Sequence, residues 1–231
     1  MESRAEQDGD QNVKGRTAAV AQTGKADGRV MFAQFGVFDD FLGTELAGQL
    51  LQYAIANEAR FEPAKVVNAN PIGLVDLEFR RCLQHDGQLG PLGKAFREII
   101  KARLPEICAV TGINACQSSL LEVNMAAHRD GGFFKEHVDT LTGNTRQDGS
   151  SDRLISAVYY FNREPVRFSG GNLVILPLTG EAEPHLIAPR HDRLVVFPSF
   201  APHAVQPVSV PGDAFADARF SINCWYLRPR S

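Results

Sequence analysis

The part of the chain after Ile113 contains eight short apolar runs, and this feature restricts the possible folds more than any other. Pro, Gly, Asp and Ser occupy the gaps between the runs, as they do between the strands of antiparallel sandwiches and barrels. The runs are SLLEVNMAAH, FFKEHVDT, RLISAVYYFN, GGNLVILPL, HLIAP, RLVVFPS, HAVQPV and RFSINCWYL. We therefore predict that they are strands of a jelly roll, in which two antiparallel sheets pack face to face.

Helices are predicted before these strands and make the chain α+β, mainly β with N-terminal helices. Asp39 and Asp40 are expected to cap a helix over residues 41–61, whose apolar residues keep helical spacing. A second helix is expected from Gly93 to about Val110 on the same periodicity. Because the helices precede the strands and do not alternate with them, a parallel βαβ sheet is disfavoured.

The chain is expected to contain one domain behind a flexible tail. Residues 1–29 contain no Phe, Trp, Tyr, Leu or Ile and cannot bury enough apolar area to offset the entropy of ordering. A partner-binding arm is the alternative for this tail. Residues 30–231 are predicted to form helical support (30–116) and a jelly-roll core (117–231), a double-stranded β-helix of the cupin type. The long polar segment 140–152 is expected to act as a lid or binding loop.

Charge and composition disfavour several classes of function. Lys and Arg number 24 against 27 Asp and Glu, so no basic excess is present to bind a nucleic acid. No apolar run approaches the roughly 18 residues that span a bilayer. The start, MESRAEQDGD, lacks the basic and then apolar pattern of a signal peptide. We expect a cytoplasmic protein without membrane attachment. The sequence contains no heptad pattern of the kind that would indicate a partner helix.

The strongest chemical signal is His137-Val138-Asp139, at the end of an apolar strand. Side chains two residues apart on a strand share a face, so the imidazole and the carboxylate can bind one metal ion. Two histidines and one carboxylate form the facial triad of non-haem iron(II). His203, which follows a Pro-rich bend, is the candidate for the third ligand. His128 is expected to line the mouth of the site, and the other histidines to lie at the surface (His85, His185 and His191).

A second candidate site lies at the start of the last strand. If the open metal positions bind 2-oxoglutarate, the far carboxylate of this co-substrate requires a buried cation. Arg219 suits that role because its planar guanidinium binds a carboxylate bidentately. Ser221 lies two residues further on, on the same face, and could add a hydroxyl hydrogen bond. An ordinary surface position is the alternative for Arg219.

Residues 118–227 resemble the iron(II)- and 2-oxoglutarate-dependent dioxygenases, in their prolyl 4-hydroxylase-like branch. The order and spacing of six motifs carry the resemblance. They are HVD at 137–139, VYYFN at 158–162, SGGNL at 169–173, DRLVVFPS at 192–199, HAVQPV at 203–208 and RFSINCWY at 219–226.

The resemblance implies roles for individual residues. His137, Asp139 and His203 are implied as the iron ligands and catalytic centre. Arg219 would bind the distal carboxylate of 2-oxoglutarate, as in the oxygen-sensing prolyl hydroxylases, whereas the collagen-type enzymes use Lys. Tyr160 would contact the same carboxylate through its hydroxyl.

Two features depart from the family pattern. The 16 positions from His203 to Arg219 are more than in many relatives. The strand before the metal motif lacks the active-site Tyr that the family often carries, and Asn124 is the candidate for its place. Ser221 keeps to the pattern by completing an R-x-S motif. Trp225 is expected in the core, as is Cys224.

The implied reaction is hydroxylation of an unactivated C–H bond, with release of succinate and CO2. The substrate would be an amino acid, a peptidyl residue or a small metabolite, chosen by loops 63–80 and 140–152. Fe(II), 2-oxoglutarate and O2 are the implied cofactor and co-substrates, with ascorbate as an optional reductant. Two alternatives stay open: a cupin-like metalloenzyme that does not use 2-oxoglutarate, and a non-catalytic jelly-roll module.

Overall fold

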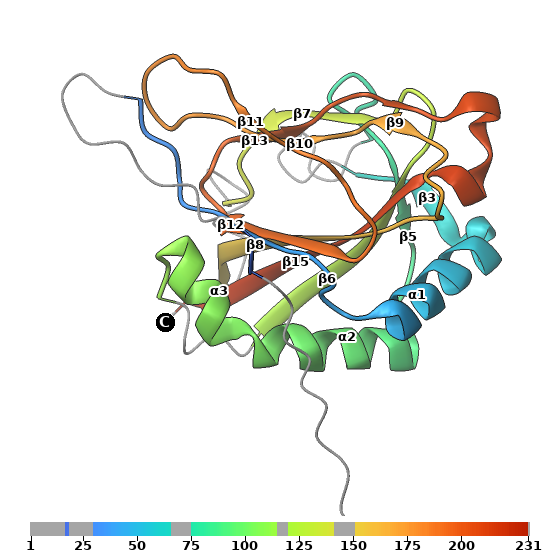
Figure 1. The fold of residues 1–231 in the computed structure, drawn as a ribbon, viewed down its shortest axis with the longest axis horizontal. Helices are drawn as coiled ribbons and strands as arrows, with labels where there is room; N and C mark the ends of the chain where they lie inside the picture. The colour runs from blue at the N-terminus through green and yellow to red at the C-terminus, as the bar shows by residue number, and fades with distance from the viewer. Residues whose placement is uncertain (1–16, 19–29, 66–74, 115–119, 141–150, 231) are drawn as a thin grey trace, which may run out of the picture.

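The computed structural model describes residues 17–18, 30–65, 75–114, 120–140 and 151–230. Within these residues, an eight-stranded sheet (order β1-β2-β12-β8-β15-β6-β5-β3) faces a five-stranded sheet (order β11-β10-β13-β7-β4). Figure 1 shows helices α1, α2 and α3 along the outer face of the larger sheet, with the smaller sheet on the opposite side. The predicted jelly roll with N-terminal helices is confirmed.

The elements have the following bounds. The larger sheet contains β1 (Thr17–Ala18), β2 (Gly36–Phe38), β3 (Phe61–Pro63), β5 (Leu83–His85), β6 (Leu120–His128), β8 (Ser151–Phe161), β12 (Arg193–Pro198) and β15 (Arg219–Pro229). The smaller sheet contains β4 (Arg80–Arg81), β7 (Phe133–His137), β10 (Leu173–Ile175), β11 (His185–Ile187) and β13 (His203–Val205). A short pair joins β9 (Ser169–Gly170) to β14 (Val208–Ser209). The helices are α1 (Thr44–Ala56), α2 (Gly90–Ala102) and α3 (Leu104–Thr111), with short 3-10 turns at Glu58–Arg60, Pro211–Asp213 and Phe215–Asp217.

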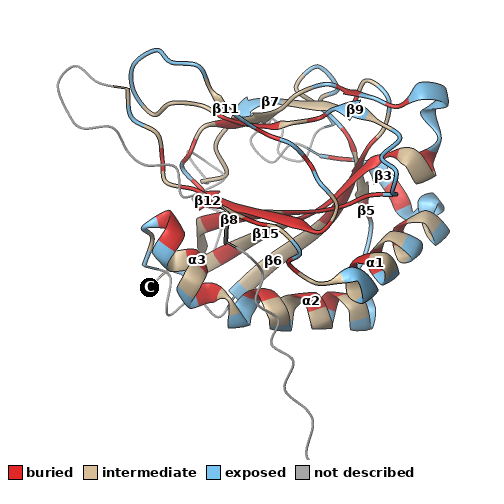
Figure 2. Cartoon of the chain, in the orientation of Figure 1, coloured by how far each residue is buried: buried red, intermediate tan, exposed pale blue. Residues whose placement is uncertain are grey.

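Strands β6, β8 and β15 are neighbours in the larger sheet and separate the helical core from the space between the sheets. Side chains alternate along each strand, so every second residue faces the helices. Those residues are apolar or aromatic and almost fully buried (Met125, Ala127, Ile155, Tyr159, Phe161, Phe220, Ile222, Cys224 and Tyr226). Figure 2 shows the buried residues concentrated in these strands and on the inward sides of the helices. The other face of the same strands is therefore left for polar side chains.

The helix boundaries differ from the prediction. The first helix begins only at Thr44, and Asp39 does not cap it, because this carboxylate binds the guanidinium of Arg193 at 2.6 and 2.8 Å. The second predicted helix is two helices that meet at Arg103. Pro105 explains the break, since it lacks an N–H and its ring would clash with the carbonyl four residues earlier.

Other predictions fall largely outside the described residues. Of the predicted tail, the structure describes Thr17–Ala18, which pair with β2. Most of the predicted lid, over residues 141–150, is not described, nor are residues 66–74 of the other predicted substrate loop. None of the helices in the described part of the chain is long and apolar enough to cross a membrane.

Asp192 joins the larger sheet to the start of α1. Its carboxylate accepts hydrogen bonds from the backbone N–H groups of Leu42 and Gly43 and from the Tyr159 hydroxyl, each at 2.8 Å. The residue is 5% exposed, and its φ of 54° is a conformation that Asp and Asn adopt more readily than other side chains. No side chain caps the first turn of α1, and the segment that leads into it is instead held by Asp192, a residue distant in sequence.

Asp192→Ala is expected to lower the free energy of unfolding by about 2–4 kcal/mol, because a buried hydroxyl and two N–H groups lose their acceptor and φ becomes strained. Urea denaturation measures the loss. Asp192→Asn keeps an acceptor oxygen and tolerates this φ, so it should lose about half as much. Adding Tyr159→Phe to the alanine variant should recover part of the stability. An alanine variant as stable as the parent would contradict this role.

Candidate metal centre

His137, Asp139 and His203 meet between the two sheets. His137 ends β7 and His203 opens β13, and the two residues are directly paired across these strands. Asp139 follows β7 by two residues, and its backbone N–H donates to the carbonyl of Ser199 at 2.9 Å. One ligand atom from each of the three side chains lies within 4.8 Å of the others. The third ligand predicted from the sequence therefore reaches the first two.

The backbone fixes which nitrogen of each histidine is free. The Nδ1 atom of His137 lies 2.7 Å from the Lys135 carbonyl, and that of His203 lies 2.9 Å from the Ala201 carbonyl. A carbonyl only accepts, so each Nδ1 carries the proton and each Nε2 keeps its lone pair. The Nε2 atoms lie 3.7 and 3.6 Å from the two carboxylate oxygens of Asp139. This tautomer is the one a metal-binding histidine needs when it binds through Nε2.

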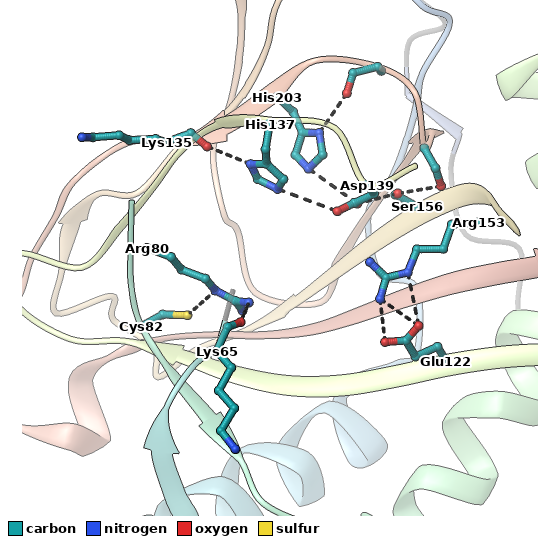
Figure 3. A network of polar contacts seen from close by, with 12 residues as sticks. Lys65, Arg80, Cys82, Glu122, Lys135, His137, Asp139, Arg153, Ser156 and His203 are labelled. Carbon is teal, nitrogen blue, oxygen red and sulfur yellow. Dashed lines mark hydrogen bonds and ion pairs between the residues drawn. The ribbon is translucent and has the colours of Figure 1, made fainter. Parts of the chain in front are cut away.

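The surroundings of the triad favour deprotonated ligands. Burial, and then the neighbouring His203, lowers the pKa of His137 to about 3, so its imidazole is neutral. Burial raises the pKa of Asp139, but the two imidazoles and hydrogen bonds from Ser156 and Trp225 outweigh it and lower that pKa overall. The Ser156 hydroxyl donates to Asp139 at 2.6 Å and lies 3.0 Å from the Ser199 hydroxyl. Figure 3 shows the three ligands facing one another. Two imidazoles and one carboxylate fit divalent iron.

Arg219 lies in the same cavity as a buried charge without a counterion. The residue is 1% exposed, and no carboxylate of the described residues lies within ion-pairing distance of it. Its Nε–H donates to the Gly171 carbonyl at 2.8 Å, and its guanidinium carbon lies 4.8 Å from the centre of the Tyr160 ring. Burial lowers the pKa of Arg219, because desolvation disfavours the charged guanidinium. A buried unpaired cation implies an anionic ligand.

His128 faces Arg219 and adds a second donor. The two residues are paired across β6 and β15, with His128 Nδ1 3.3 Å from a terminal nitrogen of the guanidinium. A guanidinium only donates, so Nδ1 accepts and Nε2 carries the hydrogen. Burial, followed by the charge of Arg219, lowers the pKa of His128 well below its usual value and keeps the ring neutral.

Four buried polar atoms near Arg219 have no hydrogen-bond partner within the described structure. They are His128 Nε2, the Tyr160 hydroxyl, a terminal nitrogen of Arg219 and the Ser221 hydroxyl. The residues adjoin one another, because Ser221 is paired with Tyr160 on one side and Arg219 with His128 on the other. Buried polar groups are normally paired. Four unpaired groups that can all donate fit a carboxylate, which accepts several hydrogen bonds.

The triad and Arg219 line one cavity of about 390 Å³, within the range of small-molecule sites. A neutral ion pair forms another part of its wall: Arg153 contacts both carboxylate oxygens of Glu122, at 2.7 and 2.8 Å. The Arg153 guanidinium also stacks 4.0 Å from the Trp225 ring. Figure 3 shows this pair beside the triad. The cavity therefore combines a metal-ligating set, an anion-binding set and an aromatic wall.

The structure places the other predicted residues as follows. Asn124 lines the cavity, but its amide contacts Glu122 at 3.4 Å, whereas His128 takes the position opposite Arg219. The expectation that Trp225 lies in the core is wrong, because Trp225 lines the cavity. Alternation along β15 from Arg219 would have found it, since residues 219, 221, 223 and 225 share a face.

The remaining histidines do not line the cavity. His85, expected in a surface loop, is 5% exposed, and its ring lies 3.2 Å from the Tyr53 hydroxyl. His185 and His191 are half-buried rather than solvated. Ser156 and Arg153 were not singled out from the sequence, because a Ser or an Arg in an apolar run carries no signal until strand pairing is known.

Comparison with known proteins gives consistent results. Residues 123–227 match the family model of the 2OG-Fe(II) oxygenase superfamily. The chain is 26% identical over 198 residues to an uncharacterized PKHD-type hydroxylase of Synechocystis sp., covering 83% of this chain and 62% of that protein. It is 28% identical over 203 residues to Egl nine homolog 1 of Rattus norvegicus, covering 83% of this chain and 54% of that protein. The chain thus spans a little over half the length of these curated relatives.

Solved structures share the fold. A prolyl-4-hydroxylase of Pseudomonas putida superposes with a TM-score of 0.62 at 21% identity, covering 87% of this chain and 94% of that one. A prolyl hydroxylase of Trichoplax adhaerens, in complex with a peptide fragment of the hypoxia inducible factor oxygen degradation domain, superposes with a TM-score of 0.61 at 19% identity, covering 83% of this chain and 82% of that one. These likenesses support the double-stranded β-helix architecture.

Proposed function

We propose that the protein is an iron(II)- and 2-oxoglutarate-dependent dioxygenase of the prolyl 4-hydroxylase-like branch, a proposal supported by the match of residues 123–227 to the 2OG-Fe(II) oxygenase superfamily. It would hydroxylate an unactivated C–H bond of an amino acid, a peptidyl residue or a small metabolite. Bound Fe(II) and 2-oxoglutarate would supply the oxidising chemistry, in which O2 reduction is coupled to decarboxylation of the co-substrate to succinate and CO2.

One observation carries this proposal: Arg219, buried without a counterion, and His128 line the same cavity as the His137–Asp139–His203 set. The unpartnered hydroxyls of Tyr160 and Ser221 lie next to Arg219. A metal-binding cupin-like protein needs only the triad. It would have no use for a buried cation without a counterion. Burying such a cation costs roughly several kcal/mol of desolvation. A dicarboxylate co-substrate accounts for both ends of the cavity.

We assign the ligand roles from the geometry of the side chains. His137 and His203 would hold the iron through Nε2, with their tautomers fixed by the backbone carbonyls. Asp139 would supply the carboxylate, held in orientation by the Ser156 hydroxyl. This support leaves the ligands little freedom to turn away, which is the function of hydrogen bonds around a metal site.

The distal carboxylate of 2-oxoglutarate would bind at the other end of the cavity. Arg219, Tyr160 and Ser221 would position it, and His128 would donate from Nε2. These groups contribute by orienting the co-substrate and by keeping water away from it. Asn124 lines the cavity farther along β6 and would face the substrate rather than the co-substrate.

Anaerobic titration of the protein with Fe(II) and then 2-oxoglutarate tests the proposal. We expect a weak visible absorption band when both are bound, and succinate release once O2 is admitted. Iron binding without a response to 2-oxoglutarate would favour the cupin-like alternative. Failure to bind iron would favour the non-catalytic module.

Gly171→Ala is expected to weaken 2-oxoglutarate binding by about tenfold to a hundredfold, because small misplacements of a positioning group are costly. Gly171 has φ +68°, and a Cβ there would lie 2.7 Å from the Arg219 Cδ. Gly212→Ala is the matched control, since Gly212 has φ +77° but no atom within 4 Å of an added Cβ. Calorimetry on the two Mn(II)-loaded variants measures the 2-oxoglutarate affinity of each. Equal affinities in the two variants would contradict the claim that Gly171 positions Arg219.

A cytoplasmic location is part of the proposal. Among the described residues, Cys82 and Cys224 are buried and form no disulfide. Unpaired cysteines are typical of reducing compartments. Cell fractionation with an antibody against the protein would test the location.

A further inference from the structure

We propose that Arg80 binds a carboxylate of the substrate, so that the protein acts on an amino acid or peptide that carries a carboxylate close to the C–H bond to be oxidised. This inference rests on the proposed function, because it concerns the second ligand of the same cavity. It narrows the substrate class, which the roles assigned above leave open.

Arg80 lies on the cavity wall next to the triad. It belongs to the edge strand β4, where it is paired with Phe134 of β7. Its guanidinium carbon lies 4.8 Å from the centre of the Phe134 ring. That ring stacks on the ring of His137, with the two centres 3.6 Å apart. One aromatic ring thus links the guanidinium to a proposed metal ligand, which brings a group bound by Arg80 near the reacting centre.

The guanidinium has most of its hydrogen-bonding capacity available. Its Nε–H donates to the Cys82 sulfur at 3.0 Å, and one terminal nitrogen contacts the Lys65 carbonyl at 3.5 Å. A thiol sulfur is a weak acceptor, and 3.5 Å is long for a hydrogen bond. Within the described residues, no carboxylate lies within ion-pairing distance of Arg80. The Cys82 contact fixes the direction of the side chain without neutralising its charge.

Arg80 differs in this respect from the other two arginines that line the cavity within the described residues. Arg153 is neutralised by Glu122 in a two-point ion pair. Arg219 is assigned to the distal carboxylate of the co-substrate. Among the described residues, Arg80 is therefore the cavity-lining guanidinium that has no anionic partner in those residues or in the proposed co-substrate.

The charge balance of the loaded cavity leads to the same conclusion. Divalent iron with Asp139 carries one net positive charge, and dianionic 2-oxoglutarate with Arg219 carries one net negative charge, so these groups cancel. The Lys65 ammonium is directed away from Arg80 in Figure 3. The charge of Arg80 therefore remains uncompensated. Burial and the charge of Arg219 are the larger causes that lower the pKa of His128, and the charge of Arg80 lowers it further. A monoanionic carboxylate on the substrate would neutralise that charge, and the planar guanidinium suits a carboxylate.

Arg81 provides a matched control. It is the next residue of the same strand and points to the other face, where its guanidinium carbon lies 5.9 Å from the Phe133 ring. Arg81 is exposed and does not line the cavity. Replacing it removes the same charge from the same edge strand without changing the cavity wall.

The test follows the arginine Nε–H signals by NMR in the Zn(II)-loaded full chain with saturating 2-oxoglutarate. Arg80→Gln identifies the Arg80 signal. The probes form two pairs that differ by one carboxylate: L-proline against L-prolinamide, and acetyl-Asp-Pro-amide against acetyl-Asn-Pro-amide. Proline is used because the similar solved structures are prolyl hydroxylases. The first pair tests a free amino acid as the source of the carboxylate, and the second pair tests an acidic peptide.

In at least one pair, we expect the carboxylate probe to shift the Arg80 signal saturably and to bind about tenfold or more tightly than its amide partner, as charged hydrogen bonds imply. Arg80→Gln should remove this preference, and Arg81→Gln should retain it. Three results would overturn the proposal: no saturable shift of the Arg80 signal by either carboxylate, equal affinity for carboxylate and amide, or equal effects of the two variants.

The same spectra separate this proposal from the proposed function. The Arg219 signal should shift when 2-oxoglutarate is added, before any probe is present. A silent Arg219 signal would count against the proposed function. In that case the Arg80 titration still tests the present proposal, because the preference for a carboxylate probe depends on the Arg80 guanidinium and not on the co-substrate.

Discussion

Asp139→Ala is expected to abolish succinate formation and to weaken Fe(II) binding by more than about a hundredfold. Even the loss of a residue that only hydrogen-bonds to a metal ligand typically lowers metal affinity about ten- to a hundredfold. The variant loses the only carboxylate in the triad and the acceptor of the Ser156 hydrogen bond. Metal titration by calorimetry and succinate measurement by NMR report the two effects. A fully active variant would exclude Asp139 as a ligand.

The fold of this variant can be checked independently. Without metal, the variant loses a hydrogen bond but no longer buries a carboxylate, so its unfolding midpoint should stay near that of the parent. The parent should gain about 2.7 kcal/mol when the free metal concentration is a hundredfold above its Kd, and the variant should gain less than about 0.4 kcal/mol at that concentration. Asp139→Asn keeps the shape and removes the charge. If it binds iron as well as the parent does, the negative charge is not required.

Arg219→Ala is expected to weaken 2-oxoglutarate binding by about a hundredfold or more, because removing one partner of a buried ion pair typically costs 2–5 kcal/mol. Iron binding by the triad should change little, since His137, Asp139 and His203 do not depend on the guanidinium for their hydrogen bonds. Anaerobic titrations with Fe(II) alone and then with 2-oxoglutarate separate the two steps. The visible band should be lost at co-substrate concentrations that saturate the parent.

Two further variants show what the guanidinium provides. Arg219→Lys keeps the charge but not the two-point geometry or the bond to Gly171, so its affinity should lie between those of the parent and the alanine variant. Arg163→Ala removes an exposed arginine that pairs with Asp217 and should leave 2-oxoglutarate binding unchanged. Weakened iron binding in Arg219→Ala would mean that the two ends of the cavity are not independent.

The sequence determined the class of fold and the chemically distinctive residues. Alternation of apolar and polar residues reports which residues share a face of a strand, and this is a local property. By this alternation Tyr159 and Tyr160 face opposite sides of the strand, and Tyr159 is buried against the helices and bonds to Asp192. Local patterns also placed the strands that carry His137 and His203, and Arg219 at the start of the last strand.

Local patterns were less successful at element boundaries. The prediction that Asp39 and Asp40 cap α1 is wrong, because the segment before α1 is held by Asp192, about 150 positions away along the chain, and no side chain caps the helix. The break at Arg103 depends on Pro105, whose effect a periodicity argument overlooks when the apolar spacing continues through it.

Only the tertiary structure decided which polar residues face one another. His128 lies opposite Arg219 because β6 pairs with β15, and Ser156 of β8 lies beside Asp139 because the sheet that contains β8 faces the sheet that contains β7. Strand order and register depend on how whole faces are buried, and the residues concerned are far apart in sequence. The sequence could therefore name the chemistry of iron and a dicarboxylate, while the uncompensated charge of Arg80 emerged only from the placement of the described residues around it.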